Sequence, residues 1–388
     1  MSKKKNIAVL LFGAKNIEGG GGAERFWADI SQMFESDSFN LMFFVDKITY
    51  ESLKNVNRLK NKSKIILNSD FPVDQKKLKI YLLKTYYKII SNRIKLVHIG
   101  FYNPQYYKLF KFLSLLPKLL RPKLSITIVS CFTPYCFIDE KYEKIYNMKY
   151  RYQDLFNNVN LNGVLSWYEK FKEVSEEKQI IKSNPYIYPV KYCFTDLASY
   201  KPSPKKDNVV IFASRITGIK RPFLFIEVVN KIRNISPEIF KLWEFQMYGD
   251  GDLLVDVQKK VLKEGLSDFI KFKKSSDLSK VFPKTKLFIS TQELENFTSL
   301  SMLEAMACEN AIISFDVGQT NYFVDHCYNG FLVTDNNANE FAKRIIEFIK
   351  LPVEKQESML KMSREIAINR HNKENFSSEL DSYFSHIL

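Results

Sequence analysis

The chain has 388 residues, of which 45% are hydrophobic and 26% charged, so it is long enough for two domains with cores and is not disordered as a whole. Its 58 Lys and Arg residues exceed its 43 Asp and Glu residues, for a net charge of +15. Its five cysteines contain no C-x-x-C pair and form no metal-ligand pattern with the four scattered histidines, which favours a reduced, cytoplasmic setting. No apolar run approaches the roughly 18 residues of a membrane span, so we expect any membrane contact to be peripheral.

The first half predicts strands that alternate with helices. The basic start followed by an apolar run is compatible with a secretory signal or with a first buried strand, and the glycine-rich stretch that follows favours the strand. We expect strands at 6–13, 39–46, 64–69, 94–100 and 124–131, and helices at 23–34, 50–59, 76–92 and 105–116. A less regular section follows at 137–195. Apolar strands that alternate with helices predict a parallel sheet covered on both faces.

The second half repeats this pattern after a polar, proline-containing segment at 195–208, which we interpret as a linker. We expect strands at 208–214, 244–249, 269–274, 286–291 and 311–316, and helices at 221–232, 252–265, 299–308 and from 341 to the end. The predicted fold class is α/β, with two doubly wound domains that face a cleft. We expect these domains at 1–197 and 198–370, and a C-terminal helix at 371–388 that packs back toward the first domain.

The positive charge lies almost wholly in the first half. Residues 1–200 carry 32 basic and 18 acidic residues, or +14, which leaves 26 and 25, or +1, for the remainder. Between Asp74 and Asp139 there is no acid, whereas twelve Lys and Arg residues fall between Lys76 and Lys123. The segment 76–92 is therefore either an ordinary amphipathic helix or a basic surface for anionic lipid. Nucleic acid could use the same charge, but no recognised nucleic-acid module is present.

Three strand-to-helix loops have the chemistry of a phosphate site. Gly19 to Gly22 lead into a helix, where free N–H groups and the helix dipole attract anions, although a glycine run can also be a flexible turn. Arg215 and Lys220 lie across a glycine-containing turn and could bind one diphosphate, or they could be solvated. The third loop leads into the helix at 299–308, which carries Glu304 among apolar neighbours. A carboxylate there could accept two hydrogen bonds from a ribose diol, whereas on a solvated face it would do nothing specific.

Four stretches occur in the order and spacing of a known family. They are GGGGAER at 19–25, SRITGIK at 214–220, MYGDGDL at 247–253 and ENFTSLSMLEAMACENAIISFDVG at 295–318. The sequence resembles the family 4 retaining glycosyltransferases of the GT-B fold (glycosyl transferases group 1), most strongly over 208–335. The resemblance implies a nucleotide-sugar donor, transfer with retention of configuration and no metal cofactor. It also implies that a phosphate oxygen accepts the proton of the acceptor, so no side-chain base is obligatory.

The resemblance assigns roles by position. It implies catalytic roles for Arg215, Lys220 and Glu295, of which the two cations hold the diphosphate. It implies that the donor is bound by Gly21, Gly22, Asn296, Phe297, Thr298, Ser299, Leu300 and Glu304, with the ribose held by Glu304 and phosphate by backbone N–H groups at 297–300.

Two departures from the family pattern affect the sugar end of this site. The family separates two glutamates by seven residues, whereas Glu295 and Glu304 are separated by eight and Asn296 stands in the strict position. Either Glu295 reaches the donor sugar through a one-residue bulge, or Asn296 replaces it. The histidine that many relatives carry after the strand at 124–131 is absent, with Cys131 and Phe132 at that place.

Two further motifs support neither a metal site nor an NAD site. Asp250 and Asp252 form a D-x-D, but they lie in a glycine turn that the resemblance explains. The G-x-G at 249–251 lacks the third glycine of a dinucleotide fingerprint. We therefore predict a glycosyltransferase for a saccharide or lipid-linked acceptor in envelope or surface polysaccharide synthesis. Its expected location is cytoplasmic, peripheral to an anionic membrane. The alternative is a non-catalytic protein that binds a nucleotide sugar or a polyanion.

Overall fold

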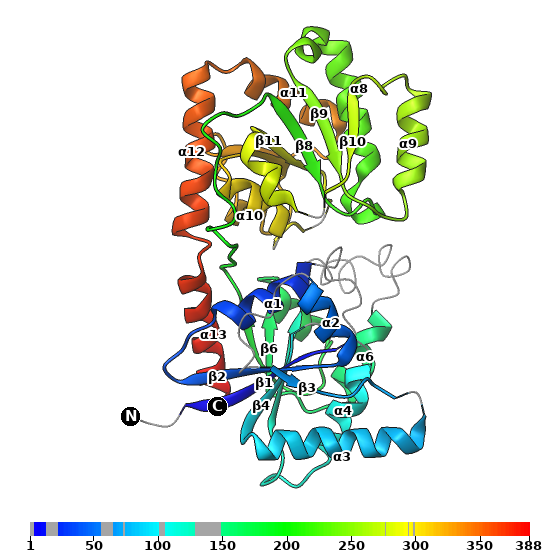
Figure 1. Cartoon of the computed structure of the whole chain (residues 1–388), viewed down its shortest axis with the longest axis vertical. Coiled ribbons are helices and arrows are strands. Elements are labelled where there is room, and N and C mark those ends of the chain that lie inside the picture. The colour runs from blue at the N-terminus through cyan, green and yellow to red at the C-terminus, as the bar shows by residue number, and fades with distance from the viewer. Residues whose placement is uncertain are drawn as a thin grey trace. The chain divides into compact units, whose positions relative to one another are not determined.

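The computed structural model describes residues 4–12, 22–55, 65–72, 74–100, 105–128, 149–275, 277–293, 295–297 and 299–388. The chain divides into two compact units, the first made of Met1–Lys191 with Lys373–Leu388 and the second of Tyr192–Asn372 (Figure 1). The boundaries therefore lie at 191/192 and 372/373, whereas the sequence led us to expect 197/198 and 370/371. Among the described residues, no helix is both long and apolar enough to cross a membrane.

The first unit contains a parallel sheet of seven strands in the order β3-β2-β1-β4-β5-β6-β7. Its strands are β1 (Lys5–Leu11), β2 (Phe39–Val45), β3 (Ile65–Leu67), β4 (Ile94–Ile99), β5 (Lys123–Ile128), β6 (Gly163–Ser166) and β7 (Tyr186–Pro189). Beyond an exposed lysine at or near their starts, the central strands are mostly apolar and buried because helices cover both of their faces.

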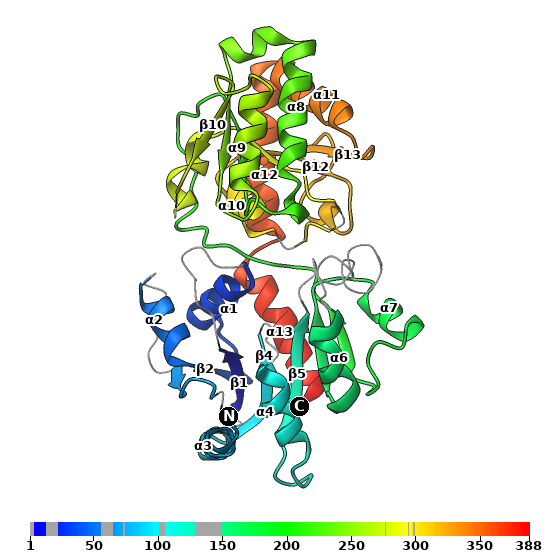
Figure 2. The same ribbon diagram turned by 90° about the vertical axis from the view of Figure 1, so that its right-hand side faces the viewer.

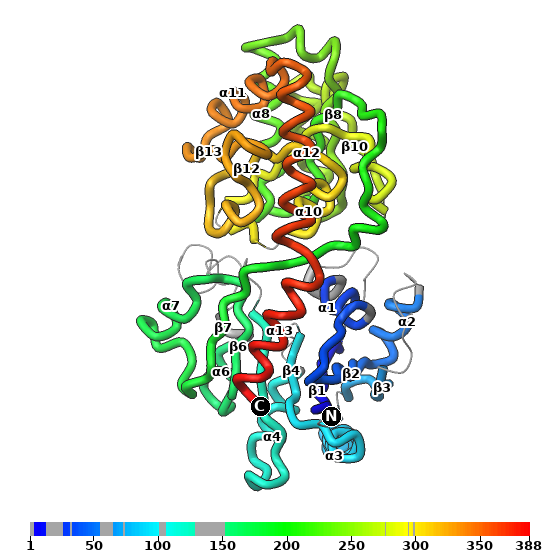
Figure 3. The backbone as a smooth tube through the Cα atoms, turned by 90° about the vertical axis from the view of Figure 1, so that its left-hand side faces the viewer, coloured from blue at the N-terminus to red at the C-terminus, as the bar shows by residue number. Residues whose placement is uncertain are grey.

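One face of this sheet carries α3 (Gln75–Ser91), α4 (Gln105–Ser114) and α6 (Lys149–Asn158), whose buried side chains share one core with strand residues such as Leu10, Val97 and Ile126. The opposite face carries α1 (Gly22–Met33) and α13 (Lys373–Ile387), because His98 of β4, which alternates along the strand with core residues Val97 and Ile99, contacts Trp27 of α1 and Tyr383 of α13 with ring centroids 5.0 and 6.1 Å apart. Figure 3 shows α13 running along this unit. The remaining helices are α2 (Lys47–Asn55) and α7 (Phe171–Glu177).

The second unit contains a parallel sheet of six strands in the order β10-β9-β8-β11-β12-β13. The strands are β8 (Val209–Ala213), β9 (Glu244–Tyr248), β10 (Ile270–Lys273), β11 (Leu287–Ser290), β12 (Ala311–Phe315) and β13 (Gly330–Val333). Its helices are α8 (Pro222–Ile235), α9 (Leu254–Lys263), α10 (Leu300–Ala307), α11 (Ala338–Lys350) and α12 (Val353–Asn369), several of which face the viewer in Figure 2. This order and the flanking helices are those of a doubly wound domain.

The segment at 195–208, which we expected to be a linker, is part of the second unit. Lys206 carries it there, since the ammonium is largely buried and donates to the carbonyl oxygens of Thr285 at 2.8 Å and Cys308 at 2.6 Å. Burial lowers the pKa of Lys206 to about 8. The backbone N–H of Asp207 also donates to the Lys284 oxygen at 2.7 Å. This polar, proline-containing segment is therefore held in the second unit by hydrogen bonds from its lysine to backbone carbonyl oxygens.

Candidate functional site

The candidate site lies where the strand order of the second sheet reverses direction. β8 and β11 are neighbours in the sheet but not in the sequence, and in doubly wound sheets ligands bind outside the carboxyl ends of the strands at such a switch point. The loop after β8 contains Arg215 and Lys220, and the loop after β11 contains 291–299. Two of the three loops that the sequence singled out therefore leave adjacent strands on the same edge of one sheet.

Hydrogen bonds join these two loops directly. The hydroxyl of Thr291 donates to the backbone oxygens of Lys220 at 2.7 Å and Arg221 at 3.1 Å. The ammonium of Lys220 donates to the side-chain oxygen of Gln292, whose amide donates in turn to the Glu295 backbone oxygen. Lys220 ends a short 3-10 turn, η3 (Gly218–Lys220). This turn and these bonds hold the Lys220 ammonium beside the β11–α10 loop.

Arg215 differs from Lys220 in its surroundings. It follows β8 at once and is solvent-exposed, and among the described residues its guanidinium has no hydrogen-bond or ion-pair acceptor. An exposed guanidinium keeps five N–H donors for an anion. The structure gives no contact between Arg215 and Lys220. The two residues are related only by lying in the same loop, after β8, at the switch point.

The start of α10 offers backbone donors. Ser299 is its N-cap, and the serine oxygen accepts from the N–H of Met302 at 3.4 Å. The N–H groups of the first helical turn have no partner inside a helix, and those of Ser299, Leu300 and Ser301 have no acceptor within the described residues. Thr298, another predicted donor ligand, lies outside the described residues.

Glu304 lies in the second turn of α10 and is only 2% exposed. The solvated helix face that we considered for this residue is therefore wrong. A carboxylate held in such a place must be compensated by hydrogen bonds or by charge, which is a costly arrangement for a residue without a role.

Glu295 is fully buried and ties three backbone groups together. Its Oε1 accepts from the N–H of Asn296 at 2.8 Å, of Phe297 at 2.8 Å and of Gln319 at 3.1 Å. Desolvation nevertheless raises the pKa of Glu295 to about 7, because these three bonds offset only part of the cost of burying the charge. The carboxylate thus links the β11–α10 loop to the turn that follows β12.

That turn is shaped around the carboxylate. Gly318 has a φ of +52°, and a side chain at this position would place its Cβ 2.1 Å from Oε2 of Glu295. Only a glycine leaves room for the carboxylate while adopting the left-handed conformation.

Asn296 joins the ends of two strands. Its amide nitrogen donates to the hydroxyl of Ser290, which ends β11, at 2.9 Å and to that of Ser314 in β12 at 3.0 Å. Its side-chain oxygen is buried, and no hydrogen-bond donor reaches it among the described residues. An amide fits this position well because its nitrogen can donate to both hydroxyl oxygens. A carboxylate has no hydrogen to donate and could bond to the two serines only by accepting their hydroxyl hydrogens.

Phe297 anchors the loop from below. Its backbone N–H is bound by Glu295, and its ring packs against Tyr322 at 5.4 Å and Phe323 at 5.3 Å. The backbone donors left for an anion are therefore those at the start of α10, not that of Phe297. His371 packs against both Phe323 and Phe297, with ring centroids 4.6 and 6.4 Å away.

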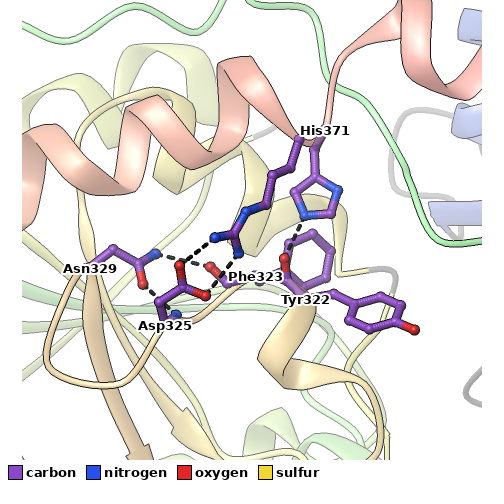
Figure 4. A network of polar contacts seen from close by, with 6 residues as sticks. Tyr322, Phe323, Asp325, Asn329 and His371 are labelled. Atoms are coloured by element: carbon purple, nitrogen blue, oxygen red, sulfur yellow. Dashed lines mark hydrogen bonds and ion pairs between the residues drawn. The ribbon is translucent and has the colours of Figure 1, made fainter.

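A polar network fixes the segment that carries these rings (Figure 4). Nε2 of His371 donates to the Tyr322 oxygen at 2.8 Å, which defines the neutral tautomer, and burial lowers the pKa of His371 to about 4. Arg370 forms a two-pronged ion pair with Asp325 at 2.8 and 2.5 Å. The amide of Asn329 donates to the Phe323 oxygen at 2.9 Å. The end of α12 is thereby joined to the loop beneath the site.

The predicted site residues fall into three groups. The second unit brings together the predicted residues from its two adjacent loops and α10, namely Arg215, Lys220, Glu295, Asn296, Phe297, Ser299, Leu300 and Glu304. Gly22 begins α1 in the first unit, while Gly21, Thr298, Cys131 and Phe132 lie outside the described residues. In the part of the chain that the structure describes, no three His, Cys, Asp or Glu side chains cluster as a metal site requires.

Sequence reasoning missed five polar residues and one glycine that hold the loops in place. These are Ser290, Thr291, Gln292, Ser314, Gly318 and Gln319. Each lies at the carboxyl end of β11 or β12 or within a few residues of it. A buried strand that ends in polar residues beside a predicted switch point was the available signal.

Comparison with known proteins gives these features a family context. The family model described as "Glycosyl transferases group 1" matches residues 196–366, which include every candidate residue of the second unit. Over 211 residues the chain is 24% identical to the GtfA subunit of UDP-N-acetylglucosamine–peptide N-acetylglucosaminyltransferase of Streptococcus gordonii. Over 202 residues it is 27% identical to the poly(ribitol-phosphate) alpha-N-acetylglucosaminyltransferase of Staphylococcus aureus. These matches take in 53% and 50% of this chain, which spans only 40% and 38% of the two relatives' lengths.

Solved structures share the fold over nearly the whole chain. Anabaena HepE, solved with UDP and glucose, is 17% identical with a TM-score of 0.73, over 98% of this chain and 99% of HepE. S. aureus TarM, solved in a complex that includes UDP, is 14% identical with a TM-score of 0.71, over 98% of this chain and 99% of TarM. The predicted fold class is therefore confirmed: the chain has the α/β fold of GT-B proteins, with two doubly wound domains and a last helix that belongs to the first. At these identities the likeness establishes the fold alone.

Proposed function

We propose that this protein is a glycosyltransferase that moves a sugar from a nucleotide-sugar donor to a saccharide or lipid-linked acceptor with retention of configuration. One observation carries the proposal. Two adjacent loops at the switch point of the second sheet are hydrogen-bonded to each other and bring a lysine, helix N–H groups and a buried glutamate to the edge where such sheets bind ligands.

Each group has a role in breaking the bond to a diphosphate. Arg215 and Lys220 supply positive charge where the leaving diphosphate becomes more negative, and such charge is most effective when water is excluded. The free N–H groups at the start of α10 bind phosphate oxygens. Glu304 accepts hydrogen bonds from the ribose diol. A phosphate oxygen accepts the proton of the acceptor, so the proposed reaction needs neither a side-chain base nor a metal ion.

The comparisons support UDP as the nucleotide to test first. HepE, TarM and a pneumococcal O-GlcNAc transferase were all solved with UDP, and the S. aureus relative is named for an α-linked product. Transfer with retention from an α-linked nucleotide sugar would give such a product. The acceptors in the relatives' names, a peptide and a poly(ribitol-phosphate), belong to those proteins, and we propose for this chain the broader class of envelope or surface glycans.

We assign Glu295 a positioning role. Its carboxylate is bound by three backbone N–H groups and faces Gly318 at close range, so it shapes the loop that precedes α10. The Glu295→Gln variant retains an oxygen for these donors and should keep most of its turnover, with an altered pH profile. Glu295→Ala removes the acceptor and should lose donor binding as well.

The decisive experiment incubates the pure protein with a panel of nucleotide sugars and no acceptor. A glycosyltransferase is expected to hydrolyse its own donor slowly and to be thermally stabilised by it. Lys220→Gln should abolish the hydrolysis, whereas Lys274→Gln, at an exposed lysine of the same unit that pairs with Asp250, should not. Hydrolysis that EDTA abolishes would refute the metal-independent mechanism.

The runner-up is a non-catalytic protein that binds a nucleotide sugar or a polyanion. The altered spacing of Glu295 and Glu304 favours it, because the residue in the strict position, Asn296, is occupied with Ser290 and Ser314. Thermal stabilisation by a nucleotide sugar without any hydrolysis, with or without acceptor glycans, would establish this alternative.

We further propose that the protein works in the cytoplasm at an anionic membrane surface and that nucleic acid is not its partner. The charge of residues 1–200 supports an anionic partner, and the absence of a recognised nucleic-acid module argues for lipid. A panel of anionic vesicles and duplex DNA at matched charge separates the two, since preferential retention by DNA would overturn the choice.

A further inference from the structure

The first unit has an apolar stripe on the outer side of α3. Ile80, Leu83, Tyr87 and Ile90 are all exposed, with 72% of the Tyr87 side chain accessible. At 100° per residue these four positions fall within about 80° of one another. The residues that α3 buries are Leu78, Tyr81, Thr85 and Ile89, and they lie on the opposite side of the helix. The core therefore accounts for one apolar side of α3 and leaves the other unexplained.

A neighbouring loop continues this apolar surface. The hydroxyl of Tyr86 donates to the Leu120 oxygen at 3.0 Å, and the Tyr86 ring packs edge-on against Phe112 of α4. The segment after α4 thus lies against α3, at the edge of the first unit where Figure 2 draws α3 end-on. Three of its leucines are exposed, and Leu119 is 98% accessible. They are Leu115, Leu119 and Leu120.

Lysines border the stripe on both sides. On the helical wheel Lys79 falls on one side of the stripe, and Lys77 and Lys84 fall on the other. None of these three forms an ion pair with a described residue. The nearest acids along the chain are Asp70 and Asp74, before the helix, and each accepts a backbone N–H. An apolar stripe with a purely cationic border matches an anionic, apolar surface.

Helix α9 of the second unit is an instructive contrast. It also exposes two apolar residues one heptad apart, Val255 and Leu262, as surface helices commonly do. Two of its lysines, however, pair with acids: Lys259 with Asp256 at 3.6 Å, and Lys260 with Glu227 at 3.0 Å and Glu264 at 3.6 Å. Exposed apolar residues alone are thus ordinary in this protein, and α3 differs from α9 in that its three flanking lysines are all unpaired among the described residues and an exposed leucine loop lies beside it.

We propose that the outer side of α3 and the 115–122 loop form a membrane-contact surface that inserts into the headgroup region of an anionic bilayer. Apolar side chains enter the acyl boundary, Tyr87 lies at the interface, and the flanking lysines bind lipid phosphates. A second copy of the chain is a poor occupant, because a symmetric contact would place lysine against lysine. The surface serves the proposed function by bringing the protein to a lipid-linked acceptor, but vesicle binding needs no donor.

The first test is co-sedimentation of the full chain with vesicles, either neutral or containing about one third anionic phospholipid. We expect binding to anionic vesicles that weakens with salt. The double variant Leu83→Ser with Tyr87→Ser should lower the partition coefficient about tenfold or more. The matched control, Val255→Ser with Leu262→Ser, should bind as the unaltered protein does. Lys79→Gln and Lys84→Gln should each cost about fivefold.

Insertion is measured separately by tryptophan fluorescence. The three native tryptophans, Trp27, Trp167 and Trp243, are buried, so a tryptophan placed at the surface reports on its own site. Tyr87→Trp should be quenched by brominated lipids in anionic vesicles, and Leu262→Trp should not.

Three results would overturn the proposal. They are no binding to anionic vesicles at low salt, equal binding by the α3 and α9 double variants, or a dimer in solution that Leu83→Ser with Tyr87→Ser converts to monomers. These outcomes are independent of the proposed reaction, because donor hydrolysis is expected to be unchanged in every variant used. Vesicle binding without any donor hydrolysis would refute the reaction and leave the surface intact.

Discussion

Replacement of Gly318 by alanine tests the link between Glu295 and the turn after β12. Gly265, in the same unit, also has a positive φ, of +63° against +52°. The two glycines differ in their neighbours. A Cβ at 318 would lie 2.1 Å from Oε2 of Glu295, whereas one at 265 would meet nothing nearer than a nitrogen of the Arg233 side chain at 3.9 Å.

The magnitudes follow from this difference. An alanine in the left-handed region costs about 1 kcal/mol, and this cost is common to both variants. Gly318→Ala must also displace the Glu295 carboxylate, which leaves the buried N–H groups of Asn296, Phe297 and Gln319 without their acceptor. At about 1 to 3 kcal/mol for each such group, Gly318→Ala should destabilise the second unit by roughly 3 kcal/mol or more beyond Gly265→Ala.

The unfolding of the second unit alone can be measured in urea by monitoring hydrogen exchange in peptides from β8 and β12. We expect the midpoint of Gly318→Ala to fall well below that of Gly265→Ala. In a Glu295→Ala background, where no carboxylate remains to clash, the cost of Gly318→Ala should shrink to about 1 kcal/mol. Equal losses for the two glycine variants, or a cost at 318 that is unchanged without Glu295, would refute the reasoning.

Three further predictions concern charge. Glu304→Gln should weaken UDP binding about tenfold or more, because a charge-assisted bond to the ribose is worth about 1.5 to 3 kcal/mol; calorimetry that finds unchanged affinity would remove Glu304 from the site. The raised pKa of Glu295, about 7, gives a stabilisation that is complete below its ordinary value of 4.5 and is lost as the pH rises through 7. Glu295→Gln should abolish this contribution, about 3 kcal/mol in all, and an unchanged pH profile of unfolding would contradict it. The lowered pKa of His371, about 4, gives a stabilisation that is present above pH 6.5 and is lost as the pH falls through 4. In the Glu295→Gln variant, where Glu295 no longer titrates, the free energy of unfolding should therefore fall steadily from pH 6.5 to 4. A flat profile would show that His371 is not buried in its neutral form.

The sequence predicts much of the architecture because buried parallel strands appear in it as continuous apolar runs. The strands β2, β3, β4 and those from β8 to β12 lie within the ranges we expected, and β1 and β5 each begin one residue before them. It fails for β6, β7 and β13. β7 is an edge strand that is only half-buried and ends in Pro189, so it lacks the buried apolar run that marks a central strand.

The sequence is less informative about α3. At 100° per residue Leu82, Tyr86, Ile89 and Ile90 fall opposite Lys77, Lys84 and Lys88 and would form the buried side of an amphipathic helix, yet Ile90 is exposed and Thr85 is buried. Thr85 is accommodated because its hydroxyl accepts from the amide of Asn68 at 2.9 Å. Such a pairing between distant residues leaves no mark on helical periodicity.

The candidate site likewise has parts that the sequence predicts and parts that it does not. Its two cations, the start of α10 and Glu304 could be predicted, because a strand followed by a polar turn and a helix is a local pattern. The contacts that organise them join separate loops, as when Thr291 binds the backbone at 220 and 221 or Glu295 binds the N–H of Gln319. They depend on which strands become neighbours, and the sequence does not contain that information locally.

The position of α13 in the first unit affects the order in which the two units can fold during synthesis. The carboxylate of Glu379 accepts the N–H of Lys191 at 2.9 Å, and Gly163 of β6 has no space for a side chain, since a Cβ would lie 2.2 Å from Ile387. A ribosome releases the strands of the first unit early and α13 only after the whole of 192–372. The second unit, continuous in sequence, can therefore fold during translation while the first waits with an apolar face uncovered. We therefore expect the second unit to complete its fold before the first.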